Sequence, residues 1–102
     1  MSGTAAEKRK AIQLEYGGLF DAISKLLFEA DPIGINFETN PEEYEPEVGT
    51  IIPRLTQAKS ETDVRKIVHE EFCKWFDSRT AGPIEDYGDI ASKIWAEWKR
   101  YK

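Results

Sequence analysis

Four segments of this sequence carry apolar residues at spacings of three and four, and no segment alternates apolar and polar residues with the two-residue period of a strand. The segments span about residues 7–30, 45–58, 60–79 and 83–101. Such spacing places the apolar side chains on one helical face, which has to be buried against another element. The pattern predicts an all-α fold: an antiparallel, four-helix-bundle-like single domain with a long loop between helices one and two.

The size and composition of the chain are consistent with one small helical domain. Its 102 residues are 40% hydrophobic and 12% aromatic, which is enough for one modest core, and we expect residues 1–6 to be frayed. The one cysteine, Cys73, excludes an intrachain disulfide and fits a reducing compartment. Because the N-terminus is polar and no apolar run approaches the length of a membrane span, we predict a cytoplasmic protein without a signal peptide.

Glycine and proline mark the boundaries of the predicted helices. Gly17-Gly18 interrupts the first one, and two interpretations stay open: close packing of another helix, which we favour, or a break between two shorter helices. Pro32 ends this helix. The second helix is predicted to begin near Glu45-Pro46 and to bend at Pro53.

The second half of the chain carries equally clear boundary signals. Ser60 or Thr62 is predicted to cap the third helix. A break is expected at residues 79–83, before a last helix that begins near Pro83 and is weakened in its first turns by Gly88.

The most unusual stretch is the acidic, proline-bounded segment from Asp31 to Glu47. The protein has a net charge of −5 and a pI of about 4.9, so phosphate backbones repel it and nucleic acid is not an expected partner. One interpretation of the stretch is a solvated acidic face, and the other is a docking surface for a basic protein. Because aromatic residues are interleaved with the acids, we select as candidate partner-binding residues Phe37, Glu42, Glu43, Tyr44, Glu45 and Glu47.

Asp31-Pro32-Ile33-Gly34 has the composition of a helix stop followed by a tight turn. Asp31 can accept a hydrogen bond within the turn, Pro32 fixes one backbone angle, and Gly34 permits the other. A structural role for Asp31, Pro32 and Gly34 is therefore expected, with a direct functional role for Asp31 as the alternative.

No residue set predicts a catalytic, metal or cofactor site. His69 and Cys73 share a helix face, but the chain has no second histidine or cysteine to complete a metal site, and nothing in the sequence orients the histidine as a base. The three tryptophans are expected to be structural, with Trp75 and Trp95 on core stripes and Trp98 the most exposed. We therefore predict no cofactor, no metal and, on balance, no enzymatic activity.

Asp31-Pro32-Ile33-Gly34-Ile35, followed by Glu42-Glu43-Tyr44-Glu45 and then Ile51 and Leu55, resembles a set of small bacterial proteins of unknown function. In these proteins an aromatic-rich helix end runs into Asp-Pro-Ile-Gly, and an acidic, tyrosine-containing stretch and a helix follow. The resemblance covers roughly residues 19–58, and many members have tryptophan where this chain has Ala30. It implies an all-helical fold and the class of immunity proteins that neutralise bacterial toxins.

Two functional hypotheses from different classes follow. The first is a small interaction protein, monomeric or homodimeric, that binds a basic partner through the acidic loop, with toxin neutralisation as one form of that activity. The second is a small-molecule-binding or enzymatic domain with a pocket between that loop and the last helix, lined by Tyr44, Tyr87 and Trp98. Self-association through a leftover apolar stripe is a third possibility.

Overall fold

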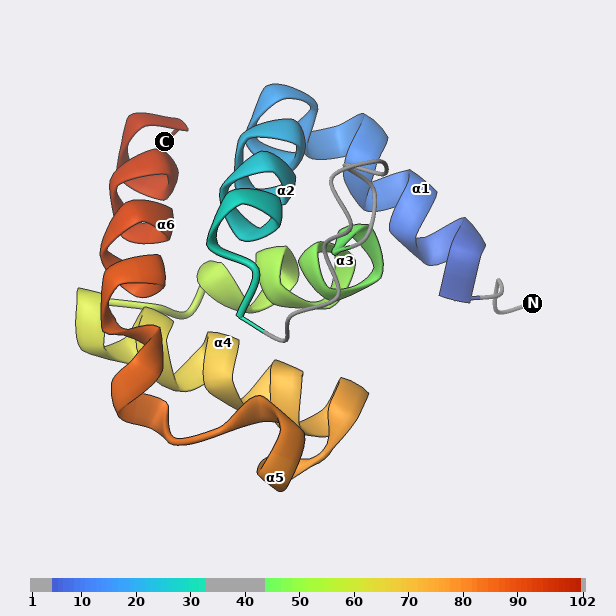
Figure 1. The fold of residues 1–102 in the computed structure, drawn as a ribbon. Coiled ribbons are helices and arrows are strands. Elements are labelled where there is room, and N and C mark those ends of the chain that lie inside the picture. The colour runs from blue at the N-terminus through green and yellow to red at the C-terminus, as the bar shows by residue number, and fades with distance from the viewer. Residues whose placement is uncertain (1–4, 33–43, 102) are drawn as a thin grey trace.

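The computed structural model of this protein describes residues 5–32 and 44–101, and these residues form helices and short connections without any strand (Figure 1). They contain six α-helices and one 3₁₀ turn: α1 (Ala5–Tyr16), α2 (Gly18–Ala30), α3 (Glu45–Leu55), α4 (Glu61–Phe76), α5 (Ser78–Ala81), η1 (Ile84–Tyr87) and α6 (Gly88–Tyr101). The predicted all-α class is confirmed.

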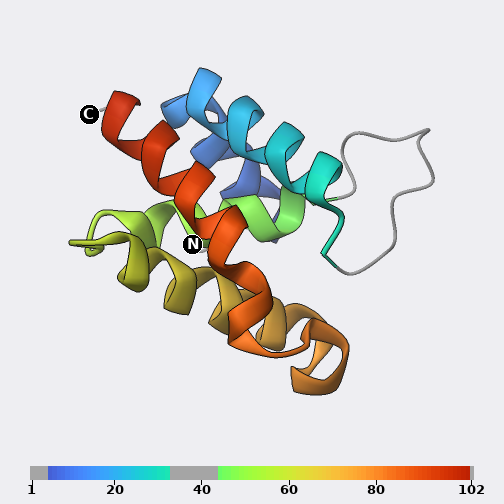
Figure 2. The same cartoon turned by 60° about the vertical axis from the view of Figure 1, so that its left-hand side comes forward.

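The helices pack as crossing pairs. α2 and α6 run antiparallel and side by side, and they cross over α3 and α4, which are antiparallel to each other (Figures 1 and 2). α1 packs on α3, while α5 and η1 form the corner that returns the chain from α4 to α6. The prediction of four helices in one antiparallel bundle is not confirmed, and the predicted long loop falls largely on residues 33–43, outside the described residues.

Gly17 breaks the first predicted helix into α1 and α2. Its φ of 45° and ψ of −110° are angles that residues with a Cβ rarely adopt, and within the described residues no neighbouring part of the fold comes within 4 Å of a Cβ built on Gly17 or Gly18. The favoured interpretation, close helix packing at the two glycines, is therefore wrong. The alternative of two shorter helices is correct, and the break allows α1 to turn and pack against α3.

Substitution of these two adjacent glycines is expected to have opposite effects. Gly17→Ala places a side chain at a positive φ and should lower the free energy of unfolding by about 1–3 kcal/mol. Gly18→Ala adds a methyl group in open space at the start of α2 and should raise it by about 0.4–1 kcal/mol. Urea denaturation followed by circular dichroism measures the stability of both variants. Equal effects of the two changes would contradict the helix break at Gly17.

The close helix contact that glycine permits is found in α3 instead. A Cβ built on Gly49 would lie 3.1 Å from the Cγ atom and 3.4 Å from the Cα atom of Arg9, so α1 crosses α3 at this glycine. The starts of α3 and α4 agree with the sequence, whereas both helices end about three residues earlier than the apolar segments predicted. α3 begins at Glu45 and contains Pro53, and the Ser60 hydroxyl caps α4 by accepting a 3.2 Å hydrogen bond from the Asp63 N–H.

Side chains hold the corner after α4 in place. Asp77, at a φ of 117°, accepts a 2.7 Å hydrogen bond from the Thr80 N–H, which lowers the pKa of Asp77. Tyr87 donates a 2.6 Å hydrogen bond from its hydroxyl to the Ala81 carbonyl. The last predicted helix accordingly begins as the 3₁₀ turn η1, and regular α-helix starts at Gly88.

One core joins the crossing helices. Phe72 is fully buried, and its ring centroid lies 5.9, 5.8 and 5.6 Å from those of Tyr44, Phe76 and Tyr87. These aromatic contacts connect α4 with the start of α3 and with η1. The remaining fully buried aliphatic side chains come from α2, α3, α4 and α6, among them Ile23, Leu27, Val48, Ile51, Ile52, Leu55, Val64, Val68 and Ile94.

The exposure expected for two tryptophans is wrong. Trp98 is only 4% exposed, because Tyr16 of α1 and Tyr101 pack against its ring at centroid distances of 6.4 and 5.9 Å. Trp75, placed on a core stripe by its spacing, is 42% exposed. The turn of α1 at Gly17 brings Tyr16 over Trp98, an effect that the spacing within the last helix does not reveal.

Candidate functional site

Tyr44 connects the end of α2 to the start of α3. Its side chain is fully buried, and its hydroxyl donates a 2.7 Å hydrogen bond to Oδ1 of Asp31, the left-handed residue with a φ of 48° that ends α2. The Asp31 side chain thus fixes the chain at the exit of α2, in line with a structural role. Tyr44, selected from the sequence as a partner anchor, presents no surface to a partner in this conformation.

The other sequence-selected residues are divided between described and undescribed parts of the chain. Phe37, Glu42, Glu43 and Gly34 lie outside the described residues, so their expected roles stay predictions. Glu45 is half-buried at the start of α3. Glu47 is 3% exposed, which removes it from any exposed acidic rim.

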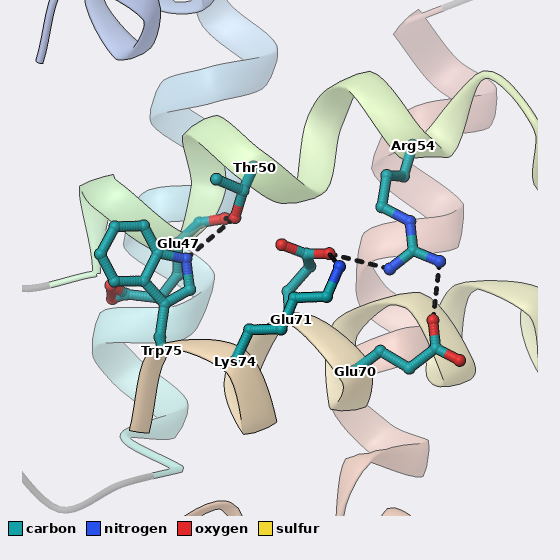
Figure 3. Close-up of polar contacts among 7 residues, drawn as sticks. All are labelled: Glu47, Thr50, Arg54, Glu70, Glu71, Lys74 and Trp75. Atoms are coloured by element: carbon teal, nitrogen blue, oxygen red, sulfur yellow. Dashed lines mark hydrogen bonds and ion pairs between the residues drawn. The ribbon is translucent and has the colours of Figure 1, made fainter. Parts of the chain in front are cut away.

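Glu47 lies at one end of a polar seam between α3 and α4, which Figure 3 shows. Arg54 of α3 spans two residues of α4, at 2.7 Å from Glu70 and 2.8 Å from Glu71, and Lys74 approaches Glu71 at 3.2 Å. The hydrogen bond between Arg54 and Glu70 raises the pKa of the guanidinium and lowers the pKa of the carboxyl. The seam fastens α3 to α4 and satisfies the buried Glu71 carboxylate.

Trp75 belongs to the same seam and has a fixed orientation. Its indole Nε1–H donates a 3.0 Å hydrogen bond to the Thr50 hydroxyl of α3 (Figure 3). The bond explains how a large aromatic side chain is held against the surface while part of it faces solvent. Arg54 and Lys74 pair with Glu70 and Glu71, so these four side chains together carry no net charge that would select a partner.

A hollow of about 340 Å³ opens between the last turns of α2, the ends of α5 and η1, and the first turns of α6. The buried Ala81, Tyr87 and Ile90 lie at its floor, and the half-buried Leu26 and Pro32 form a wall. The rim consists of exposed residues: Ala30, Glu29, Asp86, Asp89 and Lys93. Figure 2 shows the two helices that border the hollow side by side. Ligand sites are concave and combine apolar residues with a few polar groups, and the hollow has both kinds of residue.

The charge at this rim is negative. Three carboxylates, from Glu29, Asp86 and Asp89, face one ammonium group, from Lys93. The hollow also adjoins the C-terminal end of α2, where the helix dipole is negative, although the start of α6 offsets part of this effect. The site therefore favours cations over anions.

The hollow borders the last helix, as does the pocket expected between the acidic loop and that helix, but its opposite side is formed by α2 and Pro32. Of the three aromatic residues expected to line that pocket, Tyr87 contributes to the floor, and burial raises its pKa to about 12. Tyr44 and Trp98 are buried in the core and do not line the hollow. Tyr87 therefore stays protonated and bound to Ala81 at neutral pH.

His69 and Cys73 form a contact that holds the corner after α4. His69 Nε2 lies 2.8 Å from the Gly82 carbonyl oxygen and 3.6 Å from Cys73 Sγ. Because a carbonyl oxygen only accepts, this nitrogen carries a proton and donates to Gly82. It therefore cannot act as the base for the thiol, which agrees with the structural role expected for the pair.

In residues 5–32 and 44–101, no three histidine, cysteine or carboxylate side chains lie where they could hold a metal ion together. Over the same ranges, no helix has the length and apolar character that crossing a membrane requires.

Comparison of the chain with protein families, with curated proteins and with solved structures finds no match.

Glu29, Asp86 and Asp89 were not selected from the sequence. Asp86 and Asp89 are three apart, as residues on one side of a helix are, and Glu29 follows the apolar stripe of the first helix. Each pattern is equally typical of a solvated helix face. Only the antiparallel packing of α2 against α6 brings the three carboxylates to one rim.

Proposed function

We propose that this protein is a small interaction domain that binds a basic protein through the acidic surface around the hollow between α2 and α6. The observation that supports this function is the combination of an apolar floor with three rim carboxylates against one lysine. Interfaces pair an apolar centre with a charged rim, and complementary charge increases the rate of encounter.

The acidic segment selected from the sequence extends this proposal. This segment, Asp31 to Glu47, contains Pro32, which belongs to the wall of the hollow, and includes the start of α3 at Glu45. We propose that Phe37, Glu42 and Glu43 contribute to the same partner surface, with Glu45 at its edge. Tyr44 and Asp31 support this surface from inside through their hydrogen bond.

The resemblance to small bacterial proteins with an Asp-Pro-Ile-Gly motif supports a partner class. A toxin that acts on nucleic acid needs a basic surface to bind the phosphate backbone of its substrate. An acidic protein that covers this surface blocks substrate binding by charge complementarity. We propose toxin neutralisation in the cytoplasm as the form that the binding takes.

Affinity capture with charge-reversed variants tests the proposal. The immobilised protein, incubated with a lysate of its source organism, is expected to retain proteins of high pI, which mass spectrometry identifies. Glu29→Lys/Asp86→Lys should lose them. Glu15→Lys/Glu61→Lys changes the net charge equally at exposed positions away from the hollow and should keep them. Retention of the same proteins by the first variant would reject the surface, and Glu42→Lys/Glu43→Lys tests the adjoining segment in the same way.

A small cationic ligand is the second candidate function, because the hollow has a defined volume and a buried aromatic floor. A thermal-shift screen with amines and their neutral isosteres separates the two functions. An increase in Tm with a small amine at micromolar concentration would favour the ligand-binding domain over the interaction domain.

A further inference from the structure

We infer that the hollow between α2 and α6 is a socket for a single lysine or arginine side chain of the partner protein. This inference rests on the proposed function and specifies the chemical group that enters the site. Three observations support it. Buried apolar residues lie beneath an exposed charged rim, the rim is negative, and Lys93 of this chain already pairs with one rim carboxylate.

The floor and wall of the socket suit an aliphatic stem. Tyr87 and Ile90 are buried beneath the opening, and Leu26 forms part of its side. Lysine and arginine place methylene groups along apolar surface while the charged end group stays near water. An entirely apolar side chain would instead bring an apolar group against the rim carboxylates and remove part of their hydration, which costs free energy.

Two carboxylates at the rim are available for the charged end. Within the part of the chain that the structure describes, neither Glu29 nor Asp86 forms an ion pair. Both are exposed and retain their hydration, so a cation can approach them without breaking an existing pair. An ammonium or guanidinium group bound there gains charge-assisted hydrogen bonds.

Lys93 acts as a competitor that the chain itself supplies. Its Nζ lies 3.3 Å from Oδ2 of Asp89, the third carboxylate of the rim, and both side chains are more than half exposed. An exposed pair of this kind is weak and exchanges readily. An incoming cation can therefore take the place of Lys93 at Asp89, and removal of the lysine charge should strengthen binding.

The test uses the full chain, labelled with ¹⁵N, and four small probes. These are the capped amides of lysine, arginine and norleucine, the last of which keeps an aliphatic stem without the charge, and free putrescine. At low salt the lysine and arginine probes should shift the amide signals of Glu29, Asp86 and Asp89 with millimolar affinity. Norleucine amide should leave these signals in place, and salt should weaken binding of the lysine and arginine probes because the rim is exposed.

Three single variants sharpen the test. Asp86→Asn should weaken binding of the lysine probe roughly twofold to fivefold, and Lys93→Gln should strengthen it by a similar factor. Glu85→Gln, one residue before Asp86 but outside the lining of the hollow, should leave the affinity unchanged. All three side chains are exposed, so the variants are expected to fold, and each amide spectrum checks this directly.

The outcomes separate the socket from the wider function. No localised shift with the lysine or the arginine probe, equal shifts with norleucine, or an unchanged affinity in Asp86→Asn would overturn the socket. Stronger binding of putrescine than of both capped residues would assign the hollow to a small amine and overturn it too. Capture of basic proteins that still depends on Glu29 and Asp86 would then leave the proposed interaction function intact without the socket.

Discussion

Phe72→Ala is expected to lower the free energy of unfolding by about 3–5 kcal/mol, the largest effect of any substitution considered for this protein. The ring is fully buried and contacts Tyr44 at the N-cap of α3, Phe76 of its own helix, and Tyr87 of η1. A cavity at this point weakens α4, the start of α3 and η1 together. Since domains of this size are stable by only about 5–15 kcal/mol, a large share of the stability is lost.

Phe76→Ala is the matched control for this prediction. It removes the same ring from the same helix, one turn later, where the side chain is only half-buried. Chemical denaturation followed by circular dichroism measures both variants, and we expect a clearly smaller loss for Phe76→Ala. A loss at Phe72 no greater than that at Phe76 would mean that the aromatic cluster is not the centre of the core.

Arg54→Met is expected to cost about 1–3 kcal/mol, because among the described residues the buried Glu71 carboxylate would keep only Lys74 as an ionic partner. The Glu71 side chain is 6% exposed, whereas those of Arg54 and Lys74 are 36% and 70% exposed. Arg54→Met/Glu71→Met removes both charges and should cost less than Arg54→Met alone. Arg100→Met, which breaks an exposed pair with Glu97, is the control and should change stability by no more than about 1 kcal/mol.

The pH dependence of the same variants gives a second measurement. Arg54 lowers the pKa of Glu70 through their hydrogen bond. A carboxyl with a lowered pKa in the folded state contributes stability above its unfolded pKa, and that contribution is lost as the pH falls through the folded value. Arg54→Met should therefore show a smaller loss of stability on acidification than the unchanged protein. An identical acid profile would contradict the role assigned to the seam.

The helices themselves could be predicted because their signals are local. The start of α3 at Glu45, the Ser60 cap of α4 and the end of α2 before Pro32 all depend on residues within one or two turns. The elbow at Gly17 was only an alternative, since a glycine pair is equally compatible with close helix packing. The choice between these two interpretations depended on whether another helix packs against Gly17-Gly18. In the structure the close helix contact is made at Gly49, where α1 crosses α3.

The candidate site was much less predictable. Tyr44 was selected as an exposed anchor because it is flanked by glutamates. In the structure its hydroxyl donates a hydrogen bond to Asp31, and Phe72 packs against its ring. The acidic residues around Tyr44 do not determine whether its side chain points toward solvent or into the core. Conversely, Glu29 and Asp86 have no local feature that separates them from other exposed acids of the chain.

The amino-acid sequence alone determined the all-α class, most helix boundaries and the apolar face of each helix, because apolar periodicity, caps and prolines act within a few residues. The tertiary structure decided where α1 turns, which tryptophan is covered, and which carboxylates share a rim with an apolar floor. Those features depend on contacts between residues far apart in the chain. The crossing of α2 and α6 over α3 and α4 creates such contacts, and periodicity within a single helix does not encode them.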